Sequence, residues 1–325
     1  MGATVGQLGG GSGVGAGPHF IAEACEYDRS FLNLRPRRAA ILNIEEDHLD
    51  CYKDLDAIRA AFGTFAGGVP ADGLVVLNGE DERCQALAGG IGAEVQTFGS
   101  AAGLTWRTSE IVLEDGYYSF NVERAGTVLG RVRPALAGRH NVDNALAVIA
   151  LAQHCGVAWG AMQAGLCEFR GAQRRLELRG DVAGRRILDD YAHHPTEIRA
   201  TLRAARERYS PRRLWCVFQP HQHSRTRFLL ADFAGSFAHA DRVVVPDIYF
   251  VRDSEREREL VCAEDLVKEI RGRGGDATYA RDFGSIVELL ARETEPGDVI
   301  LPMGAGNIWK VADELGQRPG GDVPD

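Results

Sequence analysis

A carboxylate and an imidazole close two short apolar segments near the start of the chain. Glu23 ends the segment HFIAE, and His48 ends the segment ILNIEEDH. Ligands of parallel α/β sheets bind beyond the carboxyl ends of the strands, and a mixed oxygen and nitrogen donor set suits Mg²⁺ or Mn²⁺. Glu23 and His48 are therefore candidate metal ligands. The alternative, two solvated loop residues, stays open on this pattern alone.

Two asparagines lie three positions apart in the first turn of a helix predicted over residues 141–153. They stand in the segment GRHNVDNALAVIALA, and a separation of three places them on one helix face. Asparagine amides can read the donor and acceptor edge of adenine. Asn141 and Asn144 are therefore candidate adenine contacts, and a helix N-cap followed by a solvated asparagine is the alternative.

A loop rich in acidic and histidine side chains follows a predicted strand in the second half of the chain. Its sequence, DDYAHHPTE, places Asp190, Tyr191, His193 and His194 just before a helix that begins near Pro195. The two histidines suit proton relay, metal binding or phosphate contact. Because neighbouring side chains point in different directions, one metal shared by both histidines is not expected.

Two further loops follow predicted strands and carry groups that suit anions. The segment FQPHQHSRTR offers guanidinium forks for a carboxylate or phosphate, and the turn in PMGAGNIWK exposes backbone N–H groups ahead of a helix. The candidate residues are His221, Arg225, Arg227, Gly304, Ala305 and Gly306. Five polar loops after five strands indicate a common ligand site better than five unrelated surface loops do.

The elements that would position these loops alternate between strands and helices. Apolar runs predict strands over residues 19–23 and 39–44, and apolar spacing predicts a helix over residues 54–66. Alternating residues and the turn Asp115-Gly116 predict a small antiparallel β insertion within residues 95–136. From residue 179 to 316 the order strand, loop, helix recurs, which is typical of a doubly wound α/β domain.

Length and composition limit the classes of protein to which the chain can belong. The chain has 325 residues, a formal net charge of −9, 45% hydrophobic and 26% charged residues, which is the profile of two globular domains. An acidic balance argues against a nucleic-acid or membrane-surface binder. Seven scattered cysteines without a CxxC pair suggest reduced thiols in the cytoplasm, and neither a signal peptide nor a membrane-inserting segment is expected.

In order along the chain, these motifs resemble those of the Mur ligases, ATP-dependent amide-bond-forming enzymes of peptidoglycan synthesis. The resemblance runs from about residue 19 to 315 and rests on EACEYDRSFL, NIEEDHLDCY, GRHNVDNALA, RRLE, DDYAHHPTEI, FQPHQHSRTR and MGAGNIWK. Within the family the chain is most similar to the branch that adds L-alanine to UDP-N-acetylmuramate. The resemblance implies a central ATP-binding domain over residues 1–178 and a Rossmann-like C-terminal domain over 179–325 with a short polar tail.

The resemblance also implies roles for individual residues. ATP would phosphorylate the lactyl carboxylate of UDP-N-acetylmuramate, and the amine of L-alanine would attack the acyl phosphate. Glu23 and His48 match ligands of Mg²⁺. The residues matching nucleotide contacts are Asn141, Asn144, Arg175, Asp190 and Tyr191. Those matching positions near the reacting and amino-acid groups are His193, His194, His221, Arg225, Arg227, Gly304, Ala305 and Gly306.

Two departures from the family pattern qualify these expectations. The family commonly carries Arg after the His of the FQPH motif, where this chain has Gln222. None of the three lysines follows a glycine, so the phosphate loop that ends in Lys and Ser or Thr is absent from this sequence. The expectation is a truncated central domain that lacks its first strand and the UDP-sugar domain, and a chain inactive on its own.

Other readings remain open at this point. A catalytically dead homologue could bind an adenine nucleotide or a partner ligase, and a Mur-type ligase could add another amino acid or a peptide. The segment SRTR favours the alanine-adding branch over the latter. Protein partners expected from the missing elements are a separate N-terminal segment or a second copy in a homodimer.

Overall fold

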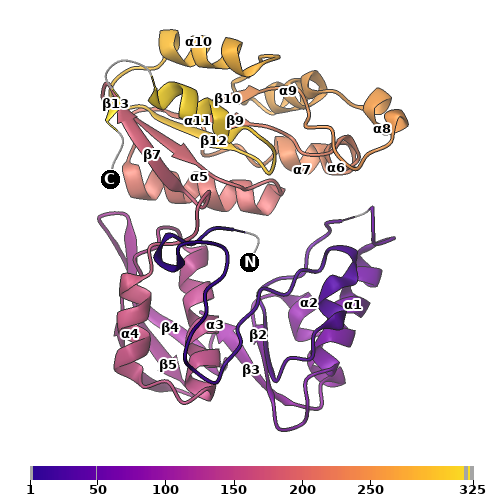
Figure 1. Cartoon of the computed structure of the whole chain (residues 1–325), viewed down its shortest axis with the longest axis vertical. Helices are drawn as coiled ribbons and strands as arrows, with labels where there is room; N and C mark the ends of the chain where they lie inside the picture. Colours follow the sequence, from indigo (N-terminus) through magenta and orange to yellow (C-terminus); the bar gives the residue numbers. More distant parts are fainter. Residues whose placement is uncertain (1–2, 49, 318–320, 323–325) are drawn as a thin grey trace. The chain divides into compact units, whose positions relative to one another are not determined.

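The structure is a computed structural model that describes residues 3–48, 50–317 and the backbone of 321–322. It forms two compact units, Met1–Gly171 and Ala172–Asp325, called here the N-terminal and the C-terminal unit (Figure 1). Strand β7 begins at Glu177 and belongs to the sheet of the C-terminal unit. The family-domain division expected after residue 178 stays a prediction, and most of the polar tail lies outside the described residues.

The N-terminal unit is built on a six-stranded sheet with the order β1-β2-β3-β4-β5-β6. Strands β1 to β4 pair in parallel, and β4, β5 and β6 form an antiparallel meander. The meander confirms the predicted β insertion, and Asp115 and Gly116 take the positive φ angles that a tight hairpin turn requires. The strand bounds are β1 (Arg38–Ile41), β2 (Leu74–Asn78), β3 (Glu94–Gly99), β4 (Trp106–Glu114), β5 (Tyr117–Arg124) and β6 (Thr127–Val132).

Helices cover both faces of this sheet because its central strands are apolar on both sides. In β2, Val75 and Leu77 pack with helix α1, while Leu74 and Val76 pack with helix α3. The predicted helices over 54–66 and 141–153 are confirmed within one residue at each end. The bounds are η1 (Gly6–Leu8), η2 (Tyr27–Asn33), α1 (Leu55–Gly67), α2 (Glu82–Gln85), η3 (Ala88–Gly90), α3 (His140–His154) and α4 (Trp159–Glu168).

The strand predicted over residues 19–23 is wrong. The segment is irregular, and Phe20 and Ile21 are 93% and 91% exposed. In the described sheet β1 is the edge strand and pairs with β2 alone, and residues 19–23 do not add a strand at its free edge. Apolar residues in this segment therefore did not by themselves produce a strand.

The C-terminal unit is built on a seven-stranded sheet with the order β11-β10-β9-β12-β8-β7-β13. The five strands from β11 to β8 are parallel, and β7 and β13 are antiparallel at one edge. This confirms the doubly wound α/β class. The bounds are β7 (Glu177–Val182), β8 (Arg185–Asp189), β9 (Leu214–Phe218), β10 (Arg242–Val245), β11 (Ala277–Tyr279), β12 (Val299–Met303) and β13 (Gly321–Asp322).

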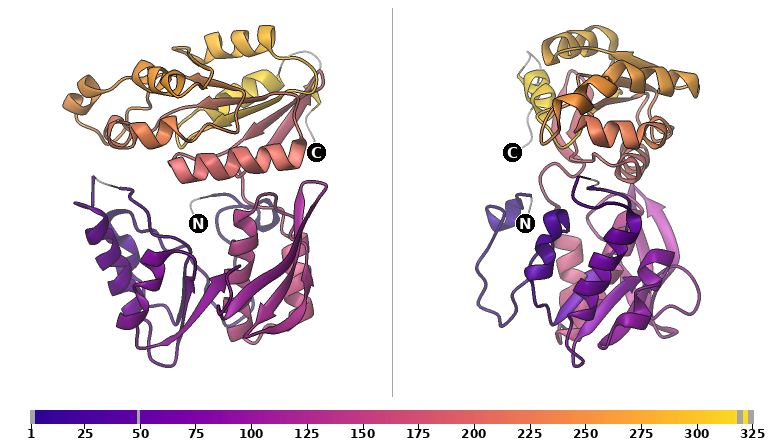
Figure 2. Two further views of the ribbon diagram at one scale, coloured as in Figure 1. Left: turned by 180° about the vertical axis from the view of Figure 1, so that it is seen from behind. Right: turned by 90° about the vertical axis from the view of Figure 1, so that its right-hand side faces the viewer.

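Two helical layers enclose the second sheet, on opposite faces in Figure 2. Leu214, Cys216 and Phe218 of β9 pack with α5, α7 and α9, whereas Trp215 and Val217 pack with α10 and α11. The two-residue alternation of a strand thus supplies both cores. The bounds are α5 (Pro195–Tyr209), α6 (His223–Phe228), α7 (Leu230–Ala234), α8 (Glu255–Leu260), α9 (Ala263–Gly272), α10 (Phe283–Glu293) and α11 (Trp309–Gly316).

The order of the strands sets where the functional loops meet. Strand β12 inserts between β8 and β9, although it follows both by more than eighty residues. The loops after β8, β9 and β12 therefore leave the same edge of the sheet side by side. Such an edge is where parallel α/β sheets bind ligands.

Candidate functional site

The loop after β8 is organised by a buried carboxylate, Asp190. Its Oδ2 accepts a hydrogen bond from the backbone N–H of Leu176, and its Oδ1 accepts one from Ala192, both at 2.7 Å. The residue is 3% exposed. Burial raises the pKa of Asp190 to about 6, although these two backbone N–H groups and the charge of Arg175 act in the opposite direction. Asp190 therefore holds the segment before β7 against the loop after β8.

Replacing Asp190 by Asn is expected to flatten the pH dependence of stability. The folded-state pKa lies above the ordinary value of 3.8, so stability is greatest below that value and falls as pH rises through 6. The difference between a pKa of 3.8 and one of about 6 corresponds to roughly 3 kcal/mol of stability. Urea unfolding of Asp190→Asn between pH 4 and 7 measures this change. The control is Asp232→Asn, and a wild-type slope in Asp190→Asn would contradict the assignment.

Arg174 ties three parts of the C-terminal unit together. Its Nη2 donates to the carbonyl oxygen of Gly304 at 2.6 Å and its Nη1 to that of Gly306 at 3.3 Å. Its Nε donates to Oδ2 of Asp189 at 3.1 Å. Sequence reasoning chose Arg175 from the RRLE motif and missed Arg174, whose signal was its place in the same motif.

Arg175, Tyr191 and the two histidines gather around the start of α5. The Arg175 guanidinium lies 5.7 Å from the centre of the Tyr191 ring, and its Nη1 is 3.6 Å from Oε1 of Glu197. Oε2 of Glu197 accepts from the backbone N–H groups of His193 and His194. Burial acts to raise the pKa of Glu197, but the charge of His193 and these hydrogen bonds outweigh it, so the pKa is lowered. Glu197 is thus a charged anchor for the loop.

The two histidines differ in what they do. His194 accepts a hydrogen bond at Nδ1 from the backbone N–H of Thr196 and caps helix α5. The His193 ring lies 6.2 Å from the ring of His221, which belongs to the loop after β9. The structure therefore brings the ring of His193 near that of His221, whereas Nδ1 of His194 is used to cap the helix.

His221 and Arg225 form a buried pair at the carboxyl end of β9. Nη1 of Arg225 lies 3.3 Å from Nδ1 of His221, and the His221 ring stacks on Tyr249 at 5.5 Å. The two residues are 7% and 8% exposed. Arg227 behaves differently, because its guanidinium makes a bidentate ion pair with Glu257 at 2.8 and 2.9 Å. Arg225 is therefore better placed than Arg227 to meet a ligand at this edge.

A second loop, after β10, is fastened to the FQPH segment. Asp253 accepts hydrogen bonds from the backbone N–H of His223 and from the Ser224 hydroxyl. The backbone N–H of Gln222 donates to Tyr249 at 3.1 Å, with a φ of 72° at Gln222. Burial lowers the pKa of His223 in spite of the nearby Asp253 charge. A neutral, buried imidazole thus follows Gln222, where the family commonly carries a charged arginine.

The turn after β12 approaches the backbone of β9 too closely for a side chain. A Cβ atom on Gly304 would lie 2.6 Å from the carbonyl oxygen of Gln219, and one on Gly306 would lie 2.5 Å from its Oε1. Gly304 also donates its backbone N–H to Asp190 at 3.1 Å. The Gln219 Oε1 is buried and has no hydrogen-bond partner among the described residues. Gly304, Ala305 and Gly306 thus form a narrow turn beside the two histidine loops.

In the N-terminal unit, His48 meets a different carboxylate from the one expected. Its Nε2 lies 3.0 Å from Oε1 of Glu26, whereas Glu23 is exposed. The hydrogen bond from His48 lowers the pKa of Glu26. The described residues contain no group of three or more His, Cys, Asp or Glu side chains that could hold a metal ion. The role of Glu23 and His48 as Mg²⁺ ligands stays a prediction, since Mg²⁺ is commonly held by one or two protein ligands together with water and substrate phosphates.

The two predicted adenine contacts are brought together at the start of α3. Nδ2 of Asn144 donates to Oδ1 of Asn141 at 3.1 Å, and Nδ2 of Asn141 donates to the carbonyl oxygen of Ala137 at 2.7 Å. The N-cap position belongs to Arg139, without a side-chain cap. The alternative of an Asn141 N-cap is therefore wrong, and adenine contact stays a prediction.

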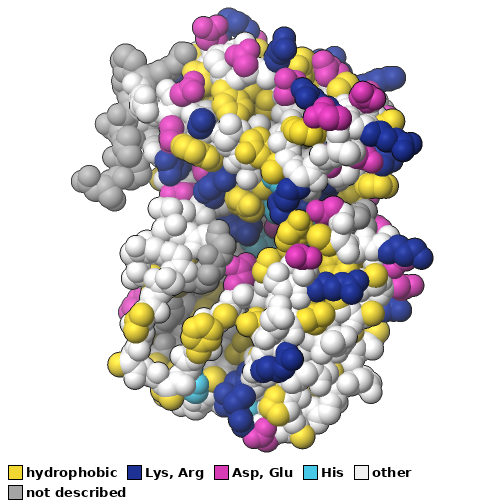
Figure 3. All heavy atoms as spheres, turned by 45° about the vertical axis from the view of Figure 1, so that its right-hand side comes forward, with side chains coloured by type: hydrophobic (Ala, Val, Ile, Leu, Met, Phe, Trp, Pro, Cys, Tyr) yellow, Lys and Arg dark blue, Asp and Glu magenta, His cyan; other side chains and the backbone are white. Residues whose placement is uncertain are grey.

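The surface of the C-terminal unit shows no patch of a single charge on the face drawn in Figure 3, where basic and acidic side chains are interspersed. Within the part of the chain that the structure describes, no helix combines the length and apolar character needed to cross a membrane.

Comparison with known protein families identifies both units. Residues 17–152 match the model of the Mur ligase middle domain, and residues 174–306 match that of the Mur ligase glutamate ligase domain. The chain is 42% identical over 316 residues to UDP-N-acetylmuramate–L-alanine ligase of Caldanaerobacter subterraneus subsp. tengcongensis. That match covers 97% of this chain and 68% of the relative, so the chain spans about two thirds of the curated protein.

Other relatives agree with this match. The enzyme of the same name from Salinibacter ruber is 39% identical over 325 residues, covering 99% of this chain and 68% of the relative. The crystal structure of UDP-N-acetylmuramate-alanine ligase from Thermotoga maritima superimposes with a TM-score of 0.78 at 27% identity. It covers 97% of this chain and 67% of the solved chain.

Proposed function

This chain belongs to the Mur ligase family, and from that premise we propose that it carries the ATP- and amino-acid-binding parts of an enzyme that joins L-alanine to UDP-N-acetylmuramate. Mur ligases perform ATP-dependent ligation in peptidoglycan synthesis. The proposal for this chain rests on its matches to both family domains and on relatives of that name at about 40% identity. The proposed compartment is the cytoplasm, and a homodimer remains a proposal.

The observation that carries the proposal is the convergence of three loops at one edge of the C-terminal sheet. The loops after β8 and β9 carry His193, His221 and Arg225, and the narrow turn that starts at Gly304 follows β12. Arg175, from the segment before β7, lies over the Tyr191 ring of the loop after β8. Positive and hydrogen-bond-donating groups of this kind fit an anionic nucleotide and an acyl phosphate. Bound ATP would supply the phosphoryl group that activates the carboxylate.

Each of these residues has a task that its surroundings support. Arg225, held against His221, is placed to stabilise charge that develops on oxygen during phosphoryl transfer and amine attack. His193 is placed to hold or pass a proton at the same edge. Arg175, half-exposed above Tyr191, is placed to contact phosphate. Glu23 and His48 would hold the Mg²⁺ that accompanies ATP, and the bound ion would help to neutralise the charge of the phosphates.

We further propose that the 325 residues are inactive as a ligase on their own. The phosphate loop of the family, which cradles the β- and γ-phosphates, is absent from this sequence. One donor of this type is worth roughly 3 kcal/mol of transition-state stabilisation, so loss of the whole element is expected to abolish turnover.

Phosphate release tests the proposed function. The purified chain is assayed with ATP, Mg²⁺, UDP-N-acetylmuramate and L-alanine, alone and joined to an N-terminal segment that supplies the phosphate loop and UDP-sugar domain of a close relative. Activity only in the joined protein is the expected result. Phosphate release by the 325 residues alone would contradict the proposal that they are inactive without the N-terminal segment. A joined protein that binds nucleotide without turnover would favour the catalytically dead homologue.

Gln222 makes the choice of amino acid a separate test. Its side chain is buried at the carboxyl end of β9, where the family commonly carries arginine, so one charged contact to an amino-acid carboxylate is replaced. A panel of amino acids and short peptides in the joined protein tests this. Preference for L-alanine is expected, and a preference for another substrate would assign the chain to another Mur-type ligase.

A further inference from the structure

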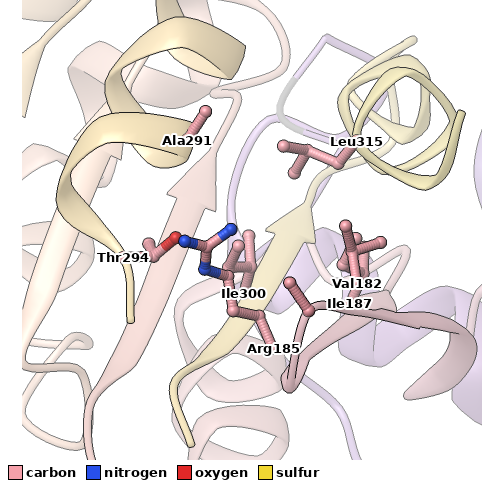
Figure 4. Close-up of a pocket in the computed structure, with 8 residues that line it drawn as sticks. Val182, Arg185, Ile187, Ala291, Thr294, Ile300 and Leu315 are labelled. Carbon is pink, nitrogen blue, oxygen red and sulfur yellow. The ribbon is translucent and has the colours of Figure 1, made fainter. Parts of the chain in front are cut away.

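The C-terminal unit contains a cavity at the other end of its sheet from the candidate site. Its volume is about 310 Å³, and strands β7, β8 and β12 and helices α10 and α11 supply its lining. Apolar side chains dominate, notably Val182, Ile187, Ile300 and Leu315. Figure 4 shows Leu315 on one side and Ala291 on the other, with open space between them. A volume of this size lies at the lower end of the range for small-molecule sites.

Of the described residues that line the cavity, Arg185 alone carries a charge. Its Nε is buried and has no hydrogen-bond partner among the described residues, and in Figure 4 its guanidinium lies between Ile300 and Thr294. The Thr294 hydroxyl donates to the carbonyl oxygen of Leu290 at 2.5 Å. A buried donor without an acceptor is destabilising, and more so on a charged group. A bound group that accepts a hydrogen bond from Arg185 Nε would remove this cost.

The neighbouring arginine shows that this placement is specific. Arg186, the next residue of β8, faces the other side of the sheet, where its guanidinium lies 5.4 Å from the centre of the Tyr209 ring. Tyr209 ends helix α5 in the opposite layer. Two adjacent arginines of one strand thus occupy different environments, since successive side chains of a strand alternate.

We propose that this cavity binds a small aliphatic carboxylate. Carboxylates pair with guanidinium groups in a two-point geometry, and an aliphatic chain would cover the Val, Ile and Leu side chains that line the space. Inorganic phosphate lacks the apolar part, and a neutral alcohol lacks the charge. Among the described residues that line the cavity, none carries an acidic side chain that would repel an anion.

This cavity is separate from the site of the proposed ligase. Arg185 opens β8 and Asp190 follows its last residue, so the two lie about 16 Å apart along the strand. A ligand in the cavity would touch none of the residues assigned to nucleotide or amino-acid binding. The inference therefore stands or falls independently of the proposed function.

Methyl NMR of the full chain with labelled Ile, Leu and Val tests the inference, with hexanoate as the probe. Saturable shifts of the methyl signals of Ile187, Ile300 and Leu315 are expected. Methyl groups of Ile198 and Leu202, in the core on the opposite face of the sheet, should stay unshifted. Hexan-1-ol is expected to bind at least about tenfold more weakly because it lacks the charge-assisted hydrogen bond.

Two matched variants decide the role of the charge. Arg185→Met is expected to weaken hexanoate binding at least about tenfold, whereas Arg186→Met should leave it unchanged. The remaining methyl spectrum shows whether each variant is folded. The inference is overturned if hexanoate shifts none of the lining methyl groups, if hexan-1-ol binds as well as hexanoate, or if Arg186→Met is as damaging as Arg185→Met.

Discussion

Replacing Arg174 by Met should lower the free energy of unfolding of the C-terminal unit by about 3 kcal/mol. The change removes donors to Gly304 and Gly306 and leaves Asp189, which is 1% exposed, without its ion pair. Breaking a buried pair on one side typically costs 3–5 kcal/mol, and the Arg174 side chain is partly exposed, so the lower value is expected. Urea unfolding of the full chain measures the loss.

The pH dependence of the Arg174→Met loss separates charge from packing. Burial raises the pKa of Asp189 even with Arg174 present, and removing the guanidinium raises it further. Stability associated with a raised carboxyl pKa is present at low pH and lost as pH rises, so the variant should suffer less at pH 4 than at pH 7. Adding Asp189→Asn should restore part of the loss. A loss of stability that is the same at pH 4 and pH 7 would contradict the role given to the charge of Asp189.

The neighbouring arginine provides the matched control for Arg174→Met. The Arg175 side chain is half-exposed, and its ion pair with Glu197 spans 3.6 Å. Exposed pairs of this kind contribute about 0–1 kcal/mol. Arg175→Met should therefore change stability by less than about 1 kcal/mol. Equal losses in the two variants would show that Arg174 does not fasten the turn after β12.

Replacing Gly304 by Ala should destabilise the same unit by about 3 kcal/mol. The glycine has a φ of 146°, which side-chain-bearing residues rarely adopt, and its Cβ would lie 2.6 Å from a backbone oxygen of Gln219. Gln219 directly follows the central strand β9 and donates its N–H to Met303 of β12, so its backbone cannot move aside without disturbing the end of the sheet. Because the Gly304 N–H donates to Asp190, the displacement should also lower turnover in the joined protein. Thermal unfolding and phosphate release measure the two effects.

Alanine substitutions at two other glycines provide controls for Gly304→Ala. A Cβ on Gly316, in helix α11, would meet nothing within 4 Å, so Gly316→Ala should raise stability by up to about 1 kcal/mol. A Cβ on Gly306 would meet the Gln219 Oε1 and the Tyr249 ring, and side chains adjust more easily than backbone. Gly306→Ala should fall between the other two. A Gly304→Ala variant as stable as Gly316→Ala would refute the close approach.

Local sequence determined the alternation of elements and the identity of the family. Apolar periodicity over residues 54–66 and 141–153 corresponds to helices α1 and α3, because each face of a helix must match a sheet beneath it. Turn residues such as Asp115 and Gly116 marked the hairpin of the β insertion. Polar motifs after the strands were recognisable in order, since each depends on a few neighbouring residues.

Tertiary structure decided which partner each side chain takes. Arg174 reaches Gly306 across 132 positions of sequence, and this contact exists because β12 inserts between β8 and β9. His48 meets Glu26 rather than the expected Glu23, and residues 19–23 remain irregular although β1 leaves one edge of the described sheet free. Pairings of this kind depend on strand order and on available neighbours, neither of which short-range spacing encodes.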